Sequence, residues 1–157
     1  MTTSGSTWLA SLEEHARAAL PPEVYRYYRQ GSRESVAATA ALGAWDRFKV
    51  APRIFSDVRA VDLTTDFLGW SASAPFGVAP TTLQRAADPG GEVATATAAR
   101  DAGVPMVVSS NATATFAEIG ATGATWWLQA YLPADRRLAE PMLAAAVEAG
   151  ARAVVLT

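Results

Sequence analysis

The sequence predicts an α/β fold in which parallel strands alternate with amphipathic helices. Four short apolar runs begin near residues 75, 105, 125 and 152, and helical patterns separate them. Alternation of this kind implies right-handed crossovers between parallel strands. Polar side chains also follow each apolar run. These observations fit either an open doubly wound sheet or half of an eight-stranded barrel, and periodicity alone does not choose between them.

Composition narrows the classes of protein to consider. The chain has 157 residues, of which 50% are hydrophobic and 18% charged, so it has the length and composition of about one domain. Its 13 basic and 15 acidic residues are dispersed, which argues against a nucleic-acid partner. Without cysteine it has neither disulfides nor thiolate metal sites. It carries no leader pattern and no apolar run of membrane-spanning length, so we expect a cytoplasmic protein.

The first part of the chain, residues 1–73, is predicted to hold helices followed by short strands. Apolar residues recur at helical spacing over 9–20, and Pro21 and Pro22 end that pattern. A second helix is expected over 23–30, closed by Gly31 as a left-handed cap. A third is expected over 35–48, and residues 58–69 indicate short antiparallel strands.

Residues 74–157 carry the regular alternation and complete a single predicted domain over 1–157. The expected strands cover 75–80, 105–109, 125–130 and 151–157. Between them, Asp88 and Pro89 are suited to begin a helix that reaches Ala102 and closes at Gly103. The other helices are expected over 115–121 and 135–149, the latter closed by Gly150. The last strand is apolar and has no successor, so we expect the fold to need further strands.

Two features favour the barrel. A doubly wound nucleotide-binding sheet has a glycine-rich phosphate loop after its first strand, but Ala79-Pro80-Thr81-Thr82-Leu83-Gln84 occupies that place. In a barrel, the C-terminal ends of the strands converge on one active-site face. The polar residues expected there are Thr81, Ser109, Gln129 with Tyr131, and Thr157.

These side chains are suited to binding rather than to proton transfer. Hydroxyl and amide groups are neutral donors and acceptors, fit to hold the edge of a flat heteroaromatic ring. The single histidine, His15, lies in the first helix among surface-type residues, so no catalytic triad or metal site is expected. Glu92 and Glu118 lie in predicted helices, where we expect cap or surface roles.

Several segments, in this order and spacing, resemble the FMN-dependent 2-hydroxy acid oxidases and dehydrogenases, the family of glycolate oxidase, lactate oxidase and hydroxymandelate oxidase. The resemblance runs from about residue 20 onward. It rests on Tyr25-Arg26-Tyr27-Tyr28-Arg29-Gln30-Gly31, Pro52-Arg53-Ile54-Phe55-Ser56-Asp57-Val58, Asp62-Leu63-Thr64-Thr65, Ala79-Pro80-Thr81, Gly91-Glu92, Ser109-Ser110, Leu128-Gln129-Ala130-Tyr131, Asp135-Arg136 and the strand ending in Thr157.

The resemblance implies an FMN-linked (β/α)8 TIM barrel, of which this chain supplies the N-terminal helices and about four strands. It implies oxidation of a small 2-hydroxy acid to a 2-oxo acid, with the base, the arginines and the lysine in the C-terminal half of the barrel. That half would come from the same or a second chain, and the complete protein is expected to be a homo-oligomer. The residues implied are Ala79, Pro80, Thr81, Ser109, Gln129 and Thr157 for FMN, Tyr27, Tyr131 and Asn111 for substrate, and Tyr131 also for catalysis.

Two alternatives stay open. The chain could be a non-catalytic half-barrel, a remnant or truncation product. The segment Asp88-Pro89-Gly90-Gly91-Glu92 departs from the family's common His-Pro form and is similar to that of the mycofactocin-precursor oxidases, which gives a minor alternative. Asn111 replaces a commonly bulky residue, so glycolate is not assumed as the substrate. The sequence leaves the electron acceptor open.

Overall fold

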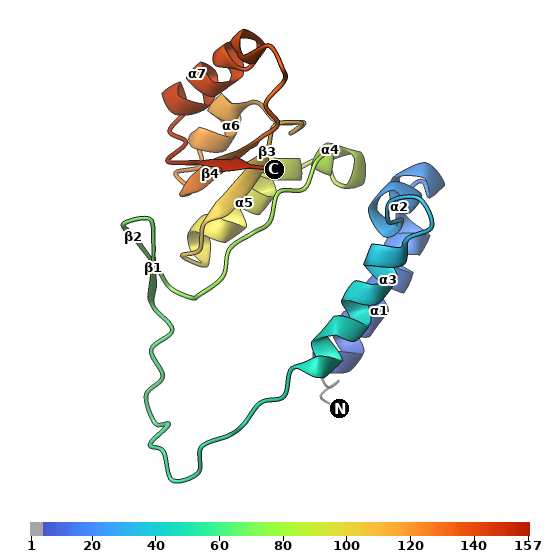
Figure 1. Cartoon of the computed structure of the whole chain (residues 1–157), viewed down its shortest axis with the longest axis vertical. Coiled ribbons are helices and arrows are strands. Elements are labelled where there is room, and N and C mark those ends of the chain that lie inside the picture. The colour runs from blue at the N-terminus through green and yellow to red at the C-terminus, as the bar shows by residue number, and fades with distance from the viewer. Residues whose placement is uncertain (1–4) are drawn as a thin grey trace. The chain divides into compact units, whose positions relative to one another are not determined.

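The computed structural model describes residues 5–157 and divides into two compact units, Met1–Arg59 and Ala60–Thr157 (Figure 1). A single domain over 1–157, with its parts meeting at 73/74, stays a prediction. Within the described residues, no helix has both the length and the apolar character needed to cross a bilayer.

The first unit is helical. It contains α1 (Gly5–Ala19), α2 (Pro22–Arg29), α3 (Val36–Ala44) and a 3₁₀ turn, η1 (Trp45–Arg47). Pro22 begins α2, as its fixed φ and missing N–H favour. The Glu13 carboxylate accepts bonds from the Arg29 guanidinium and the Tyr25 hydroxyl, which links α1 to α2.

Two expectations for this unit need correction. The third helix ends at Ala44 and tightens into η1, so it is shorter than 35–48. Gly31 is not a left-handed cap, because the chain leaves α2 at Gln30 in an extended conformation. Glycine is needed there for a different reason: a Cβ at Gly31 would lie 2.8 Å from the Ala38 Cβ, so the residue allows close packing against α3.

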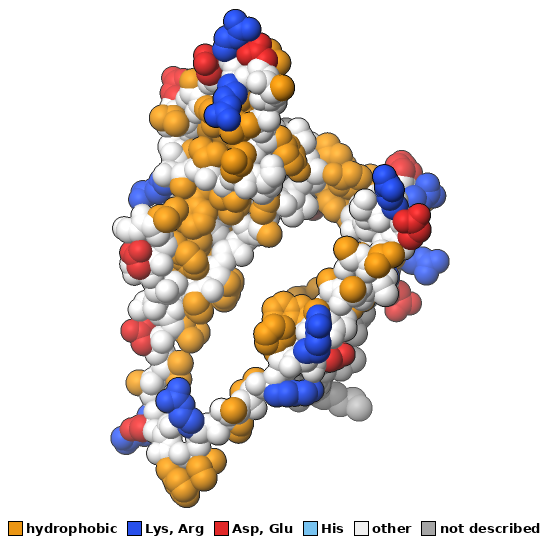
Figure 2. All heavy atoms as spheres, in the orientation of Figure 1, with side chains coloured by type: hydrophobic (Ala, Val, Ile, Leu, Met, Phe, Trp, Pro, Cys, Tyr) orange, Lys and Arg blue, Asp and Glu red, His pale blue; other side chains and the backbone are white. Residues whose placement is uncertain are grey.

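Between η1 and β1 the chain has neither helix nor strand, and many of its apolar side chains are exposed. Phe48, Val50, Ile54, Phe55 and Val58 each keep most of their surface accessible. Figure 2 shows apolar side chains gathered at the turn of this extended segment.

The second unit begins with an antiparallel hairpin, β1 (Thr65–Phe67) and β2 (Trp70–Ala72). Its turn residues Leu68 and Gly69 have φ of 54° and 80°, the positive values that a tight two-residue turn requires. An antiparallel pair is therefore present as expected, but it covers 65–72 rather than 58–69, and residues 58–64 contain no strand. The Phe67 ring meets the Trp127 ring edge-on, with centroids 6.1 Å apart.

A three-stranded parallel sheet forms the centre of the unit. Its strands are β3 (Met106–Ser109), β4 (Trp126–Ala130) and β5 (Val154–Leu156), in the order β3-β4-β5. The strand expected over 75–80 is reduced to one bridge, at Val78 beside Met106. Pro75 and Pro80 have no N–H to donate, which limits the ladder in this stretch.

The helices of this unit are α4 (Gln84–Ala87), α5 (Gly91–Asp101), α6 (Phe116–Gly120) and α7 (Glu140–Glu148), with a 3₁₀ turn, η2 (Arg136–Leu138), before α7. The short α4 was not expected. The next helix begins at Gly91 rather than Pro89, and Asp88 accepts the Gly90 N–H within the preceding turn. Gly103 and Gly150 have positive φ, as expected for helix-ending glycines.

The core lies between one face of the sheet and its helices. Met106, Val108, Trp126 and Leu128 are buried there and pack with Ile119 of α6 and with apolar residues of α5 and α7. On the opposite face, Val107, Trp127 and Val155 are half-buried. The described residues thus form a partial parallel α/β sheet and no closed barrel.

Candidate functional site

Three predicted site residues come from the C-terminal ends of neighbouring strands. Ser109 ends β3 and is paired in register with Gln129 of β4. Gln129 is paired with Val155, and Thr157 follows two positions later. Because residues two apart along a strand share a face, Thr157 lies on the same face as Val155 and Gln129. The structure therefore brings Ser109, Gln129 and Thr157 together.

The Gln129 side chain joins the three strand ends through hydrogen bonds. Its Oε1 accepts from the Ser109 hydroxyl at 3.4 Å and from the Ser110 N–H at 3.3 Å. Its Nε2 donates to the Thr157 Oγ1 at 2.7 Å. Ser109 and Gln129 are buried, whereas Thr157 is exposed. The Thr157 N–H also donates to the Ala130 carbonyl, so two bonds hold this residue.

Two loops lie beside these strand ends. The loop after Val78 carries the predicted cofactor residues Ala79, Pro80 and Thr81, all exposed. The loop after β3 carries Asn111, whose N–H donates to the Ser109 Oγ at 3.1 Å. The loops are joined directly, because the Thr82 hydroxyl donates to the Asn111 carbonyl at 2.6 Å.

The two predicted tyrosines are placed differently. Tyr131 directly follows β4 and is 59% exposed, so its phenol is available at the same end of the sheet. Tyr27 belongs to α2 in the first unit, where its ring packs edge-on against Tyr28 with centroids 5.4 Å apart.

The residues at the strand ends offer neutral hydrogen-bonding groups. Hydroxyls and an amide can donate and accept, but they do not exchange protons readily at neutral pH. Among the described residues, no three His, Cys, Asp or Glu side chains gather as a metal site. His15 is exposed on α1. The arrangement can thus hold a polar, uncharged ring edge against the strand ends.

Glu92 is the residue that sequence reasoning placed wrongly. Its side chain is fully buried instead of lying at the surface. It accepts bonds from the backbone of Gln84, Thr113 and Ala114 and from the Thr113 hydroxyl. Burial alone would raise the pKa of Glu92, but these bonds outweigh burial and lower it. Helical periodicity gave no signal, because its partners lie outside α5, at the start of α4 and in the loop after β3.

Glu118 has the expected cap role. It forms a capping box with Thr115 at the start of α6. The Arg85 guanidinium, together with bonds from Thr115, lowers the pKa of Glu118 to about 2.

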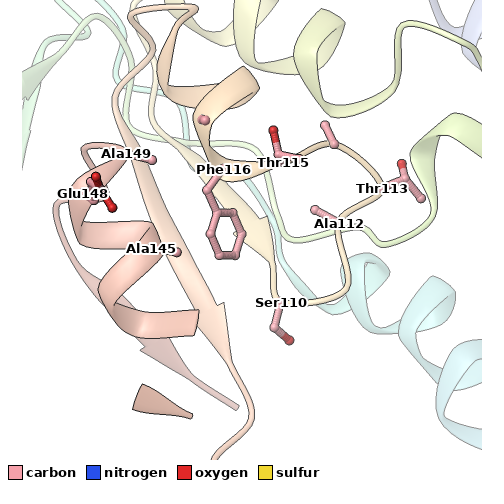
Figure 3. Close-up of a pocket in the computed structure, with 10 residues that line it drawn as sticks. Ser110, Ala112, Thr113, Thr115, Phe116, Ala145, Glu148 and Ala149 are labelled. Atoms are coloured by element: carbon pink, nitrogen blue, oxygen red, sulfur yellow. The ribbon is translucent and has the colours of Figure 1, made fainter. Parts of the chain in front are cut away.

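A separate groove of about 650 Å³ lies on the helical side of the sheet (Figure 3). Phe116 projects from the start of α6, and part of the lining comes from Ala145 and Glu148 of α7 and from Ala149 directly after it. Neither Gln129 nor Thr157 lines this groove. It meets the cluster of polar strand ends only at the loop after β3, where Ser110 and Thr113 line it.

Comparisons with known proteins agree on one family. The model of the FMN-dependent dehydrogenases matches residues 16–157. The chain is 35% identical to 2-hydroxyacid oxidase 1 of Homo sapiens, covering 92% of this chain and 40% of the relative. It is 37% identical to 4-hydroxymandelate oxidase of Amycolatopsis orientalis, covering 95% and 42%.

Solved structures give the same picture. A crystal structure of mandelate oxidase superposes with a TM-score of 0.89 and 36% identity, covering 94% of this chain and 43% of that one. Another mandelate oxidase structure contains a C4a-OH-FMN adduct. The chain thus spans about two fifths of the length of the curated relatives it matches.

Proposed function

Because the chain belongs to the family of FMN-dependent dehydrogenases, we propose that it is the N-terminal part of an enzyme that oxidises a 2-hydroxy acid to a 2-oxo acid. The remaining strands of an eight-stranded barrel would come from the same polypeptide or from a second chain. The complete protein is proposed to be a homo-oligomer.

The observation that carries this proposal is the bonded set of Ser109, Gln129 and Thr157. Three adjacent parallel strands each contribute one neutral polar side chain to one end of the sheet. In barrel enzymes that end holds the active site. The fold is also like that of mandelate oxidase over nearly the whole chain.

These residues fit FMN. The polar edge of its ring system carries both donors and acceptors, and Gln129 has both in one side chain. Its Nε2 has two N–H groups, and the bond to Thr157 uses one. The exposed backbone of Ala79, Pro80 and Thr81 would approach the ring. When bound, FMN supplies a two-electron acceptor, which none of these side chains can provide.

The substrate would meet phenols and an amide of this chain. Tyr131, exposed beyond β4, would donate a hydrogen bond to an oxygen of the 2-hydroxy acid and is the catalytic residue we assign here. Tyr27 would contact the carboxylate, and Asn111 would line the pocket. Proton removal is assigned to the rest of the barrel, because the strand ends described here carry no base.

The test is reconstitution. The chain would be continued with the C-terminal part of mandelate oxidase, purified, loaded with FMN and mixed anaerobically with mandelate. Binding of FMN and bleaching of its visible absorbance support the proposal, whatever the physiological electron acceptor. A folded product that stays colourless would instead identify a non-catalytic half-barrel. Tyr131→Phe in the same polypeptide should slow bleaching while FMN remains bound.

A further inference from the structure

Glu92 lies near the start of α5, but its carboxylate is used outside that helix. The Oε1 atom accepts from the Thr113 N–H at 2.9 Å and from the Gln84 N–H at 3.3 Å. The Oε2 atom accepts from the Thr113 hydroxyl at 2.7 Å and from the Ala114 N–H at 3.1 Å. These partners lie 8 residues before Glu92 and 21 or 22 after it.

The bonds converge from both loops beside the strand ends. Gln84 closes the loop that carries Thr81, and its own side-chain Nε2 donates to the Thr81 carbonyl at 3.2 Å. Thr113 lies two residues after Asn111 in the loop that follows β3. Its Oγ1 also accepts from the Arg85 N–H at 3.1 Å, so the hydroxyl bridges the start of α4, directly after the first loop, to the carboxylate.

The four donors described for this buried carboxylate are all uncharged. The nearby Arg85 instead pairs with Glu118 at 2.8 Å and donates to the Thr113 carbonyl. A buried carboxylate without an ion-pair partner is costly unless hydrogen bonds compensate for its lost hydration. The ionised Glu92 carboxylate is therefore stable in the interior only while both loops stay where they donate these hydrogen bonds.

We propose that Glu92 is a positioning residue that holds the loop 79–84 and the loop 110–114 in one fixed arrangement, and through them sets the geometry of the cofactor and substrate positions. The proposal rests on the proposed function for the identity of the ligands. The clamp between the two loops does not depend on that function and can be measured without FMN.

The first test measures amide hydrogen exchange in the 157-residue chain. Glu92→Gln keeps the size of the side chain but puts an NH₂ group where Oε2 accepts from Ala114, so donor faces donor. We expect faster exchange at Thr113, Ala114 and Gln84 together, while Leu128 in β4 stays protected. Glu118→Gln is the matched control, because its carboxylate lies exposed on α6 and accepts from Arg85 and Thr115 rather than from Thr113, Ala114 or Gln84.

A second variant guards against general unfolding by E92Q. Thr113→Val removes the hydroxyl bond at 2.7 Å and leaves the carboxylate in place. It should raise exchange at Ala114 and Arg85 by a smaller amount. Unchanged exchange in both variants would contradict the proposed clamp. If E92Q lowers the protection of β4 as much as that of the two loops, Glu92 stabilises the core in general and does not position the loops.

The second test uses the FMN-loaded reconstituted polypeptide. We expect E92Q to raise the FMN dissociation constant roughly tenfold, the loss typical of one charge-assisted hydrogen bond, and to alter the visible flavin spectrum. E118Q should change neither. If the unmodified polypeptide binds no FMN, the proposed function fails, while the exchange result still decides the clamp. Normal FMN affinity and spectrum in an E92Q protein with loosened loops would overturn the positioning role.

Discussion

Gln129 Nε2 lies 2.7 Å from Thr157 Oγ1, so the ends of β4 and β5 are joined by side chains as well as by the backbone ladder. The Oε1 atom of the same amide faces Ser109 and Ser110 of the neighbouring strand end. The Gln129 amide thereby determines which groups at the ends of three strands donate hydrogen bonds and which accept them. A change at Gln129 should disturb all three positions at once.

Gln129→Met should weaken FMN binding by about ten- to a hundredfold in the reconstituted polypeptide, because it removes several hydrogen-bonding groups while keeping similar volume. Fluorescence titration of FMN measures the change. Gln30→Met, at an exposed position in the first unit, is the control. Equal affinities in the two variants would contradict the assigned role of Gln129.

Gly120→Ala should destabilise the second unit by about 1–3 kcal/mol, because α6 and α7 approach too closely for a side chain. A Cβ at Gly120 would lie 2.1 Å from the Ala149 carbonyl oxygen, which is backbone and cannot rotate away. Urea denaturation measures the loss. Gly43→Ala has nothing within 4 Å of the added Cβ and should stabilise α3 by about 0.5–1 kcal/mol.

The pair formed by Phe67 and Trp127 should show measurable coupling. Their edge-on rings, 6.1 Å apart, attach the β1–β2 hairpin to the parallel sheet. A double-mutant cycle with Phe67→Ala and Trp127→Ala should give about 0.5–1.5 kcal/mol of interaction in the free energy of unfolding. Strictly additive losses would show that the hairpin is held by other contacts.

The contribution of Glu118 should depend on pH in a defined direction. Its pKa, lowered from 4.5 to about 2 by the Arg85 guanidinium and the Thr115 bonds, favours the folded state whenever the carboxylate is ionised in both states. The stability difference between the unmodified chain and Glu118→Gln should therefore be complete above about pH 5 and disappear as the pH falls through about 2.

Urea titrations at several pH values measure this difference. Thr115→Ser keeps the capping hydroxyl and should follow the unmodified chain across the range, whereas Thr115→Ala should cost about 1 kcal/mol at neutral pH. A difference for E118Q that is constant with pH would show that the loss of a hydrogen-bond acceptor, not the charge, matters at this position.

The regular part of the fold could be predicted from sequence because each element carries its own local signal. The apolar runs at β3 and β4 and the left-handed glycines Gly103 and Gly150 were found in this way. Gly31 was misread, since a glycine that ends a helix and a glycine that allows close packing look alike in sequence.

The candidate site could be predicted only where its residues lie at the ends of regular strands. The expected convergence of C-terminal strand ends placed Ser109 and Gln129 together, and their bonds follow from the register of the two strands. Glu92 was missed because its partners depend on how two loops fold back on α5, which no local pattern encodes. The expected strand at 75–80 shortened to one bridge because proline restricts pairing.

The backbone bonds of Asn111 have a consequence for sequence change at this position. Its N–H is bonded to Ser109 and its carbonyl to the Thr82 hydroxyl, while its side chain is outside both bonds. Other L-residues with the same backbone conformation can keep both bonds. Position 111 is therefore suited to diversification, by natural drift or by directed evolution, with the loop scaffold left intact.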